Sequence, residues 1–327
     1  MMLSLLVMSH VPTTSLQAEL VAGPRYTEVD RRPRSAFRTN RLRLGLSQKL
    51  GRSKLSVLLD RVDSSQGQSL FGVAGQSALL RIRRAELTYN FHPRLRLRSG
   101  LIESTYGLVV AGPWGLQSTL KLRESEPDLI HLADRGFALD WKLPHQKGAL
   151  SLVLTNGEGF AEMEKDQGKD IIFSAVVRPM SKLQLLLEAQ RGSRGAGSSR
   201  ADRLTADLNL MDREGGVGLL ANYGYGYQDD GSREHFTLSI RARRCMGRSQ
   251  VAARGSAMRT DLSGQDDQEL QVGMGLYRTL SDWVQIGVVA QKSDRTGDDG
   301  ARRPYSDRWS VQAVLLYRGK VPVSCAR

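Results

Sequence analysis

The sequence has few cysteines, few aromatic residues and no long apolar run after its first residues. Two cysteines in 327 residues exclude a small domain held together by disulfides. The absence of any later run of about 18 apolar residues excludes a bundle of membrane-spanning helices. Charged residues make up 25% and hydrophobic residues 40%, which is typical of ordered chains. One membrane architecture remains open, because a transmembrane β-barrel needs only alternating apolar residues.

Basic residues exceed acidic ones by 47 to 34, which gives a formal net charge of +13. Such an excess predicts attraction to nucleic acid, to lipid head groups or to small anions. A nucleic-acid-binding module would gather its arginines on one exposed patch. Here the arginines are spread over most of the predicted strands, so the pattern favours lipid and small anions over nucleic acid.

The first 18 residues have the shape of a secretory signal peptide. An apolar run from Met1 to Val7 is followed by polar residues and then by Ala18, where a small side chain favours cleavage. The stretch therefore predicts export, with the mature domain over residues 19–327. A misassigned start codon and a flexible tail are the alternatives.

From Phe37 onward the dominant hydrophobic period is two residues, in segments of about 8 to 12 residues. In one segment Phe236, Leu238 and Ile240 alternate with Thr237, Ser239 and Arg241. In another, Phe137, Leu139 and Trp141 alternate with Ala138 and Asp140. This period predicts strands with one apolar and one polar face, and no comparable amphipathic helix is evident.

Short turns and longer polar connections alternate along the chain. The short turns fall near 51–52, 92–93, 144–148, 179–181, 212–215, 246–247 and 279–282, and the longer connections cover 63–77, 104–134, 156–169, 192–201, 228–233, 260–267 and 292–306. This asymmetry is typical of an outer-membrane barrel, with tight periplasmic turns and long external loops. With a first strand over 19–29, the sequence predicts an all-β, transmembrane, antiparallel up-and-down barrel of about 16 strands. A soluble all-β protein is the alternative fold.

If the apolar faces meet lipid, the arginines on the polar faces must line the lumen, because a lipid-facing Arg at the bilayer centre costs about 2 to 4 kcal/mol. A lumen lined by guanidinium groups favours anions over cations. The alternative is that opposing acids neutralise these arginines. The candidate pore-lining residues are Arg41, Arg43, Arg96, Arg98, Arg241, Arg243 and Arg254.

The longest connection, 104–134, is the candidate constriction loop. Its glycines and Pro113 allow a compact turn, and a charged set follows them. If the loop folds into the channel, these charges narrow the pore; a solvated external loop is the alternative. The candidate constriction residues are Lys121, Arg123, Glu124, Glu126 and Asp128.

Four short stretches, 83–87 (Arg-Arg-Ala-Glu-Leu), 100–107, 134–137 and 156–159, resemble in their order segments of the phosphate-selective porin O and P family. The resemblance implies a 16-stranded outer-membrane porin, usually trimeric, that passes small anions such as phosphate or polyphosphate. Where that family usually has Lys and Pro, this chain has Glu103 and Thr105, and Asp134-Arg135 reverses the usual order. These departures concern phosphate selectivity more than the barrel, and the family's phosphate-binding residues find no match here.

The sequence thus predicts a passive porin of a Gram-negative-type outer membrane, in contact with lipid and lipopolysaccharide, and no enzyme. No Ser alternates on a strand beside His92, His131, His145 or His235, which disfavours an outer-membrane phospholipase. We expect no cofactor and no metal. A non-conducting barrel scaffold and a soluble basic all-β binding protein are the functional alternatives.

The two cysteines, Cys245 and Cys325, fit no metal-ligand spacing. Two unpaired thiols are the simplest interpretation of this pair. A disulfide between them is open if the protein folds in an oxidising compartment.

Overall fold

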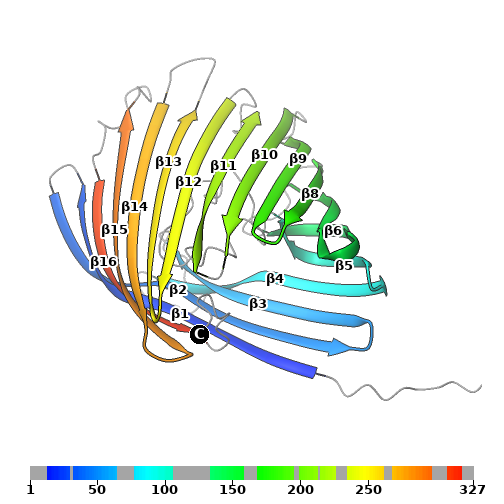
Figure 1. Cartoon of the computed structure of the whole chain (residues 1–327), viewed down its shortest axis with the longest axis horizontal. Coiled ribbons are helices and arrows are strands. Elements are labelled where there is room, and N and C mark those ends of the chain that lie inside the picture. The colour runs from blue at the N-terminus through cyan, green and yellow to red at the C-terminus, as the bar shows by residue number, and fades with distance from the viewer. Residues whose placement is uncertain are drawn as a thin grey trace, which may run out of the picture.

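The computed structural model describes residues 13–29, 32–64, 77–105, 133–157, 168–194, 199–212, 214–225, 234–260, 267–296 and 308–318. These residues form sixteen antiparallel strands that close into a barrel, which confirms the predicted fold class. Each strand pairs with the next along the chain, and β1 pairs with β16 from Glu19 opposite Arg318 to Val29 opposite Arg308. Figure 1 shows the strands following one another around the wall in chain order.

The strand bounds are close to the predicted ones. They are β1 Thr13–Val29, β2 Arg32–Leu50, β3 Ser53–Ser64, β4 Ser77–His92, β5 Leu95–Glu103, β6 Ala133–Lys142, β7 Gly148–Thr155, β8 Asp170–Met180, β9 Leu183–Arg194, β10 Ser199–Met211, β11 Gly215–Tyr225, β12 Glu234–Met246, β13 Ser249–Thr260, β14 Asp267–Thr279, β15 Val284–Thr296 and β16 Arg308–Arg318. A 3-10 helix, Pro144–Gln146, joins β6 to β7. No helix within the described ranges is long and apolar enough to cross a bilayer.

Several strands extend further than expected. The first strand starts at Thr13 instead of 19, and residues 13–18 pair with β2 between Lys49 and Leu44. Residues 1–12 lie outside the described ranges, and cleavage after Ala18 stays a prediction. The connection predicted over 192–201 is shorter, because β9 continues to Arg194 and β10 begins at Ser199.

The period of two appears as alternating exposure along each strand. On β12, Phe236, Leu238 and Ile240 are 40%, 43% and 60% exposed, whereas the intervening Thr237 and Ser239 are fully buried. On this strand the apolar side chains therefore point outward and the polar ones point inward. This is the arrangement expected of a wall with lipid outside and a polar interior.

A β-bulge interrupts this alternation on β4. The pairing with β3 shifts between Leu58 and Leu59, so that Arg84 lies opposite Leu58 and Ile82 opposite Leu59, and Arg83 is the extra residue. Two consecutive arginines can therefore both point inward. Arg83 reaches Asp60 of β3 at 3.1 Å, and Arg84 reaches Glu103 of β5 at 2.9 Å.

Candidate functional site: the inner wall

A recess of about 720 Å³ opens on the inner wall at the short-turn end of β5 to β8. Arg94, Arg96 and Arg98 alternate with Leu95 and Leu97, so all three arginines face the recess from one strand and its preceding turn. Lys142 at the end of β6 and Arg178 near the end of β8 line it as well. Five cationic side chains thus surround one cavity that is large enough for a small organic or inorganic anion.

One carboxylate, Asp140 of β6, lies within this recess. It accepts hydrogen bonds from Arg96 Nε at 2.7 Å, from Arg98 Nε at 2.7 Å and from Ser151 Oγ at 2.6 Å. Arg98 is 2% exposed and also reaches Glu86 Oε2 at 3.5 Å. The centre of the arginine row is therefore neutralised by acids.

The other three cations lack such a partner. Within the part of the chain that the structure describes, the side chains of Arg94 and Lys142 make no ion pair, and Arg178 Nε donates only to the neutral Gln184 at 3.0 Å. All three side chains are exposed. Their charges are therefore available to a solute entering from this end of the barrel.

Five of the seven predicted pore-lining arginines fall into two groups on the wall, and the other two lie on β2. Arg96 and Arg98 lie on β5, whereas Arg241 and Arg243 lie on β12 and Arg254 lies directly opposite Arg241 on β13. All five are on the inward phase. Arg43 of β2 points inward toward Asp60 at 3.4 Å. Arg41 lies on β2 opposite Val21, and its side chain is outside the described set.

Opposing acids neutralise much of the arginine charge on the β9 to β12 wall. This is the alternative that the sequence left open for the lumen arginines. Arg241 pairs with Asp207 of β10, and Asn209 lies beside them at 3.3 Å. Arg203 pairs with Glu188 of β9 at 2.6 Å, and Ser174 donates to the same carboxylate at 2.8 Å. These pairs are almost fully buried, so they hold neighbouring strands together more than they present charge to a solute.

The five candidate constriction residues, Lys121, Arg123, Glu124, Glu126 and Asp128, lie outside the described residues. Their role stays a prediction. Sequence analysis missed Arg94, Lys142 and Arg178 as site residues, although Lys142 and Arg94 share the alternation of their strands. Arg178 sits next to Pro179 at a turn and carried no signal of its own.

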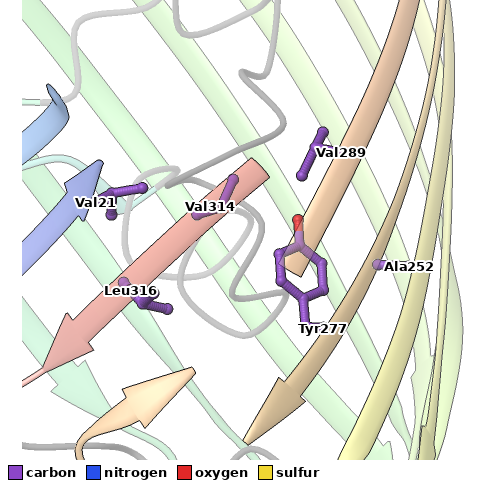
Figure 2. Packing of buried hydrophobic residues seen from close by; sticks show 6 residues of the cluster. All are labelled: Val21, Ala252, Tyr277, Val289, Val314 and Leu316. Atoms are coloured by element: carbon purple, nitrogen blue, oxygen red, sulfur yellow. The ribbon is translucent and has the colours of Figure 1, made fainter. Parts of the chain in front are cut away.

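Part of the inner wall is apolar, which the alternation did not predict. Val21, Ala252, Tyr277, Val289, Val314 and Leu316 form a cluster whose members are at most 5% exposed. Figure 2 shows their side chains on strands at the closure of the barrel, with Val21 on β1 next to Val314 and Leu316 on β16. Residues 313–317 of β16 are all apolar, so this strand has apolar side chains on both of its faces. Val314 and Leu316 point inward, whereas Leu315 and Tyr317 point outward.

The expectation of two unpaired thiols is wrong for Cys245. This residue, near the end of β12, is disulfide-bonded. Cys325, the only other cysteine of the chain, lies outside the described residues. Among the described residues no group of three or more His, Cys, Asp or Glu side chains could hold a metal ion.

Solved structures with the same fold are outer-membrane proteins. The anion-selective porin from Comamonas acidovorans matches with a TM-score of 0.68 at 11% identity, over 94% of this chain and 100% of that one. OmpT of Vibrio cholerae matches with 0.64 at 10% identity, over 95% and 98%, and the outer membrane channel DcaP of Acinetobacter baumannii with 0.64 at 13% identity, over 94% and 97%. The barrel is therefore the one used by outer-membrane porins, in agreement with the predicted location.

No protein-family model and no curated protein matches the sequence. The resemblance to the phosphate-selective porin O and P family accordingly stays a prediction.

Proposed function

We propose that this protein is a passive porin of the Gram-negative outer membrane that favours small anions, phosphate among them. The observation that carries the proposal is the recess in which Arg94, Lys142 and Arg178 have no acidic partner among the described residues. Unpaired cations at a channel mouth raise the local concentration of anions and lower the concentration of cations. The same barrel in an anion-selective porin supports this choice.

Ion selectivity in planar bilayers tests the proposal. Across a KCl gradient, the wild-type reversal potential should lie on the chloride side of zero. The double variant Arg94→Gln/Arg178→Gln should move it toward zero, while Arg191→Gln, which removes an outward-facing charge from β9, should leave it unchanged. A wild-type channel that prefers potassium would overturn the anion preference.

We propose that the porin is a homotrimer. Support comes from the trimer form in which OmpT of Vibrio cholerae has been solved. Chemical cross-linking in outer-membrane vesicles should give a ladder that stops at three copies. A ladder that stops at one copy contradicts the trimer but leaves the channel function untouched.

The burial of the β10 to β12 inner wall favours a second candidate, a barrel that does not conduct. Asn222, Thr237 and Ser239 are completely buried, although they point inward. A wide aqueous lumen would leave such side chains in contact with water. Conductance measurements decide between the two candidates.

A further inference from the structure

A second cavity, of about 740 Å³, lies on the outer surface of the barrel across β4, β5 and β6. Phe137 lines it and is 56% exposed, whereas the next residue, Ala138, is 1% exposed and points inward. The groove therefore opens on the face of the wall that meets lipid. Ile82 and Leu101 are its other large apolar lining residues.

Two glycines opposite each other on β5 and β6 form the floor of this groove. Gly100 has a φ of 108°, and a Cβ there would lie 2.3 Å from the carbonyl oxygen of Ala85. A Cβ on Gly136 would lie 2.0 Å from the carbonyl oxygen of Leu154. The backbone thus admits only glycine at both positions. Because both glycines lie between outward-facing neighbours, the groove at this point is floored by backbone and not by side chains.

A cation lines the same groove. Arg135 is on the outward phase of β6, two residues before Phe137, and its side chain is exposed. Within the described ranges its guanidinium makes no ion pair and no hydrogen bond; only its backbone is engaged, with Asp134 and Asn156. A lipid-facing arginine without a counter-ion is unfavourable unless it lies near the membrane interface or meets an anionic head group.

The position of Arg135 along the barrel identifies the leaflet. It is the third residue of β6, at the end joined to the longest connection, and such long connections face the outside of the cell in barrels of this kind. The lipid that meets Arg135 is therefore one of the outer leaflet. In that leaflet the anionic partner of Arg135 has to be a head group of the lipid itself. An acyl chain of the same lipid then fits the apolar part of the groove.

We propose that the groove over β4 to β6 binds lipopolysaccharide, with a phosphate of its head group on Arg135 and an acyl chain along Leu101 and Phe137. The guanidinium is suited to phosphate because it presents paired N–H donors in one plane. The groove contributes apolar contacts that a flat barrel wall does not offer.

Arg191 of β9 provides a matched control. It lies opposite Ile171, and Ile171 pairs with Leu154, which pairs with Phe137, so Arg191 is three strand pairings away from the groove. It is also exposed on the outward phase and makes no described ion pair, but it does not line the groove. Loss of Arg191 removes the same charge without removing the site.

The test measures lipid retained by the purified, folded barrel with native mass spectrometry, after incubation with lipopolysaccharide or with dephosphorylated lipopolysaccharide. Wild type and Arg191→Gln should retain the phosphorylated lipid about equally, and Arg135→Gln should retain roughly tenfold less. Ser99→Phe, which places a ring in the groove, should lower retention of both lipids. All variants are checked for the heat-modifiable gel shift of a folded barrel.

Equal retention by Arg135→Gln and Arg191→Gln would overturn the proposal. If Arg135→Gln instead breaks the oligomer and leaves lipid retention unchanged, the groove is a contact between copies of this chain, and the lipid site is likewise rejected. The assay measures lipid binding and not transport. Its result therefore tests the lipid site even if the barrel does not conduct ions.

Discussion

Asp140 of β6 accepts two hydrogen bonds from Arg98 of β5, from Nε at 2.7 Å and from Nη2 at 3.2 Å. One carboxylate thus binds the most buried guanidinium of the recess side-on. The same carboxylate holds Arg96. Asp140 therefore sets how much of the positive charge of β5 a solute can sense.

Neutralising this carboxylate should strengthen the preference for anions. In Asp140→Asn the charges of Arg96 and Arg98 lose their shared counter-ion, so the reversal potential should move further toward the chloride value. The folded barrel should also be less stable, by about 3 to 5 kcal/mol if the pair behaves like other broken buried pairs. Ser151→Ala is the control, because it removes a hydrogen bond to Asp140 without changing charge.

An unchanged reversal potential in a folded Asp140→Asn barrel would mean that solutes do not pass through this recess. A lowered anion preference would mean that Asp140 orients the arginines instead of masking them.

The outward phase of β12 can be tested with one substitution. Leu238 is 43% exposed and lies between the buried Thr237 and Ser239. Leu238→Arg places a charge against lipid and should cost about 2 to 4 kcal/mol near the bilayer centre, which is visible as reduced membrane assembly and loss of the heat-modifiable band. Leu238→Val should assemble normally. Normal assembly of Leu238→Arg would place this face away from lipid.

The disulfide of Cys245 predicts a link to Cys325. Six residues separate Arg318, the end of β16, from Cys325, and the seven steps along the chain can span at most about 25 Å. The four strand spacings from β16 to β12 amount to about 19 Å. The chain after β16 is therefore long enough to reach Cys245.

Gel migration without reductant measures this link. Wild type, denatured and alkylated, should run faster without reductant than with it, and Cys325→Ser should abolish the difference. Loss of the bond should lower the free energy of unfolding by about 2 to 4 kcal/mol. Two alkylated thiols in protein purified from the outer membrane would contradict the bond.

The turn between β10 and β11 predicts a local acid sensitivity. Asp212 Oδ1 accepts hydrogen bonds from the backbone N–H of Glu214 at 2.9 Å and of Gly215 at 3.0 Å. These bonds hold the pKa of Asp212 below its usual value of 3.8. Because the pKa of Asp212 is lower in the folded protein, the ionised carboxylate contributes its full stabilisation above pH 3.8. This stabilisation is lost as the pH falls through the pKa of the folded state.

Measuring the midpoint of heat unfolding against pH checks this contribution. The wild-type midpoint should fall in acid more than that of Asp212→Ala. Parallel pH curves for the two proteins would show that the charge of Asp212 does not contribute to the stability of this turn.

The strands of this chain could be predicted from the sequence because lipid favours apolar side chains and a polar interior favours polar ones. Neighbouring residues of a strand therefore alternate in polarity. Phe236 to Arg241 show the alternation that the structure confirms, and the first strand ends at Val29 as predicted. The bulge at Arg83 was not accessible, because an extra residue in one strand becomes visible only against its partner strand. The predicted start of β1 was wrong because polar residues from Thr13 onward extend the backbone pairing with β2.

The site was only partly predictable. Arg96 and Arg98 share a strand and could be placed on the inner wall by alternation alone. Their counter-ion Asp140 comes from a strand that starts 30 residues after β5 ends, and the register that brings it to them depends on the pairing of β5 with β6. Arg178 of β8 joins the recess only through two further strand pairings, β6 with β7 and β7 with β8. The buried partners Asp207 and Glu188 likewise depend on pairing rather than on local sequence.

Single-channel recording in planar bilayers tests the central claim, an aqueous passage through this barrel, most directly. Purified wild-type protein that shows the heat-modifiable shift should produce stepwise current increments of uniform size. Folded protein that inserts into the bilayer and yields no steps would contradict the account.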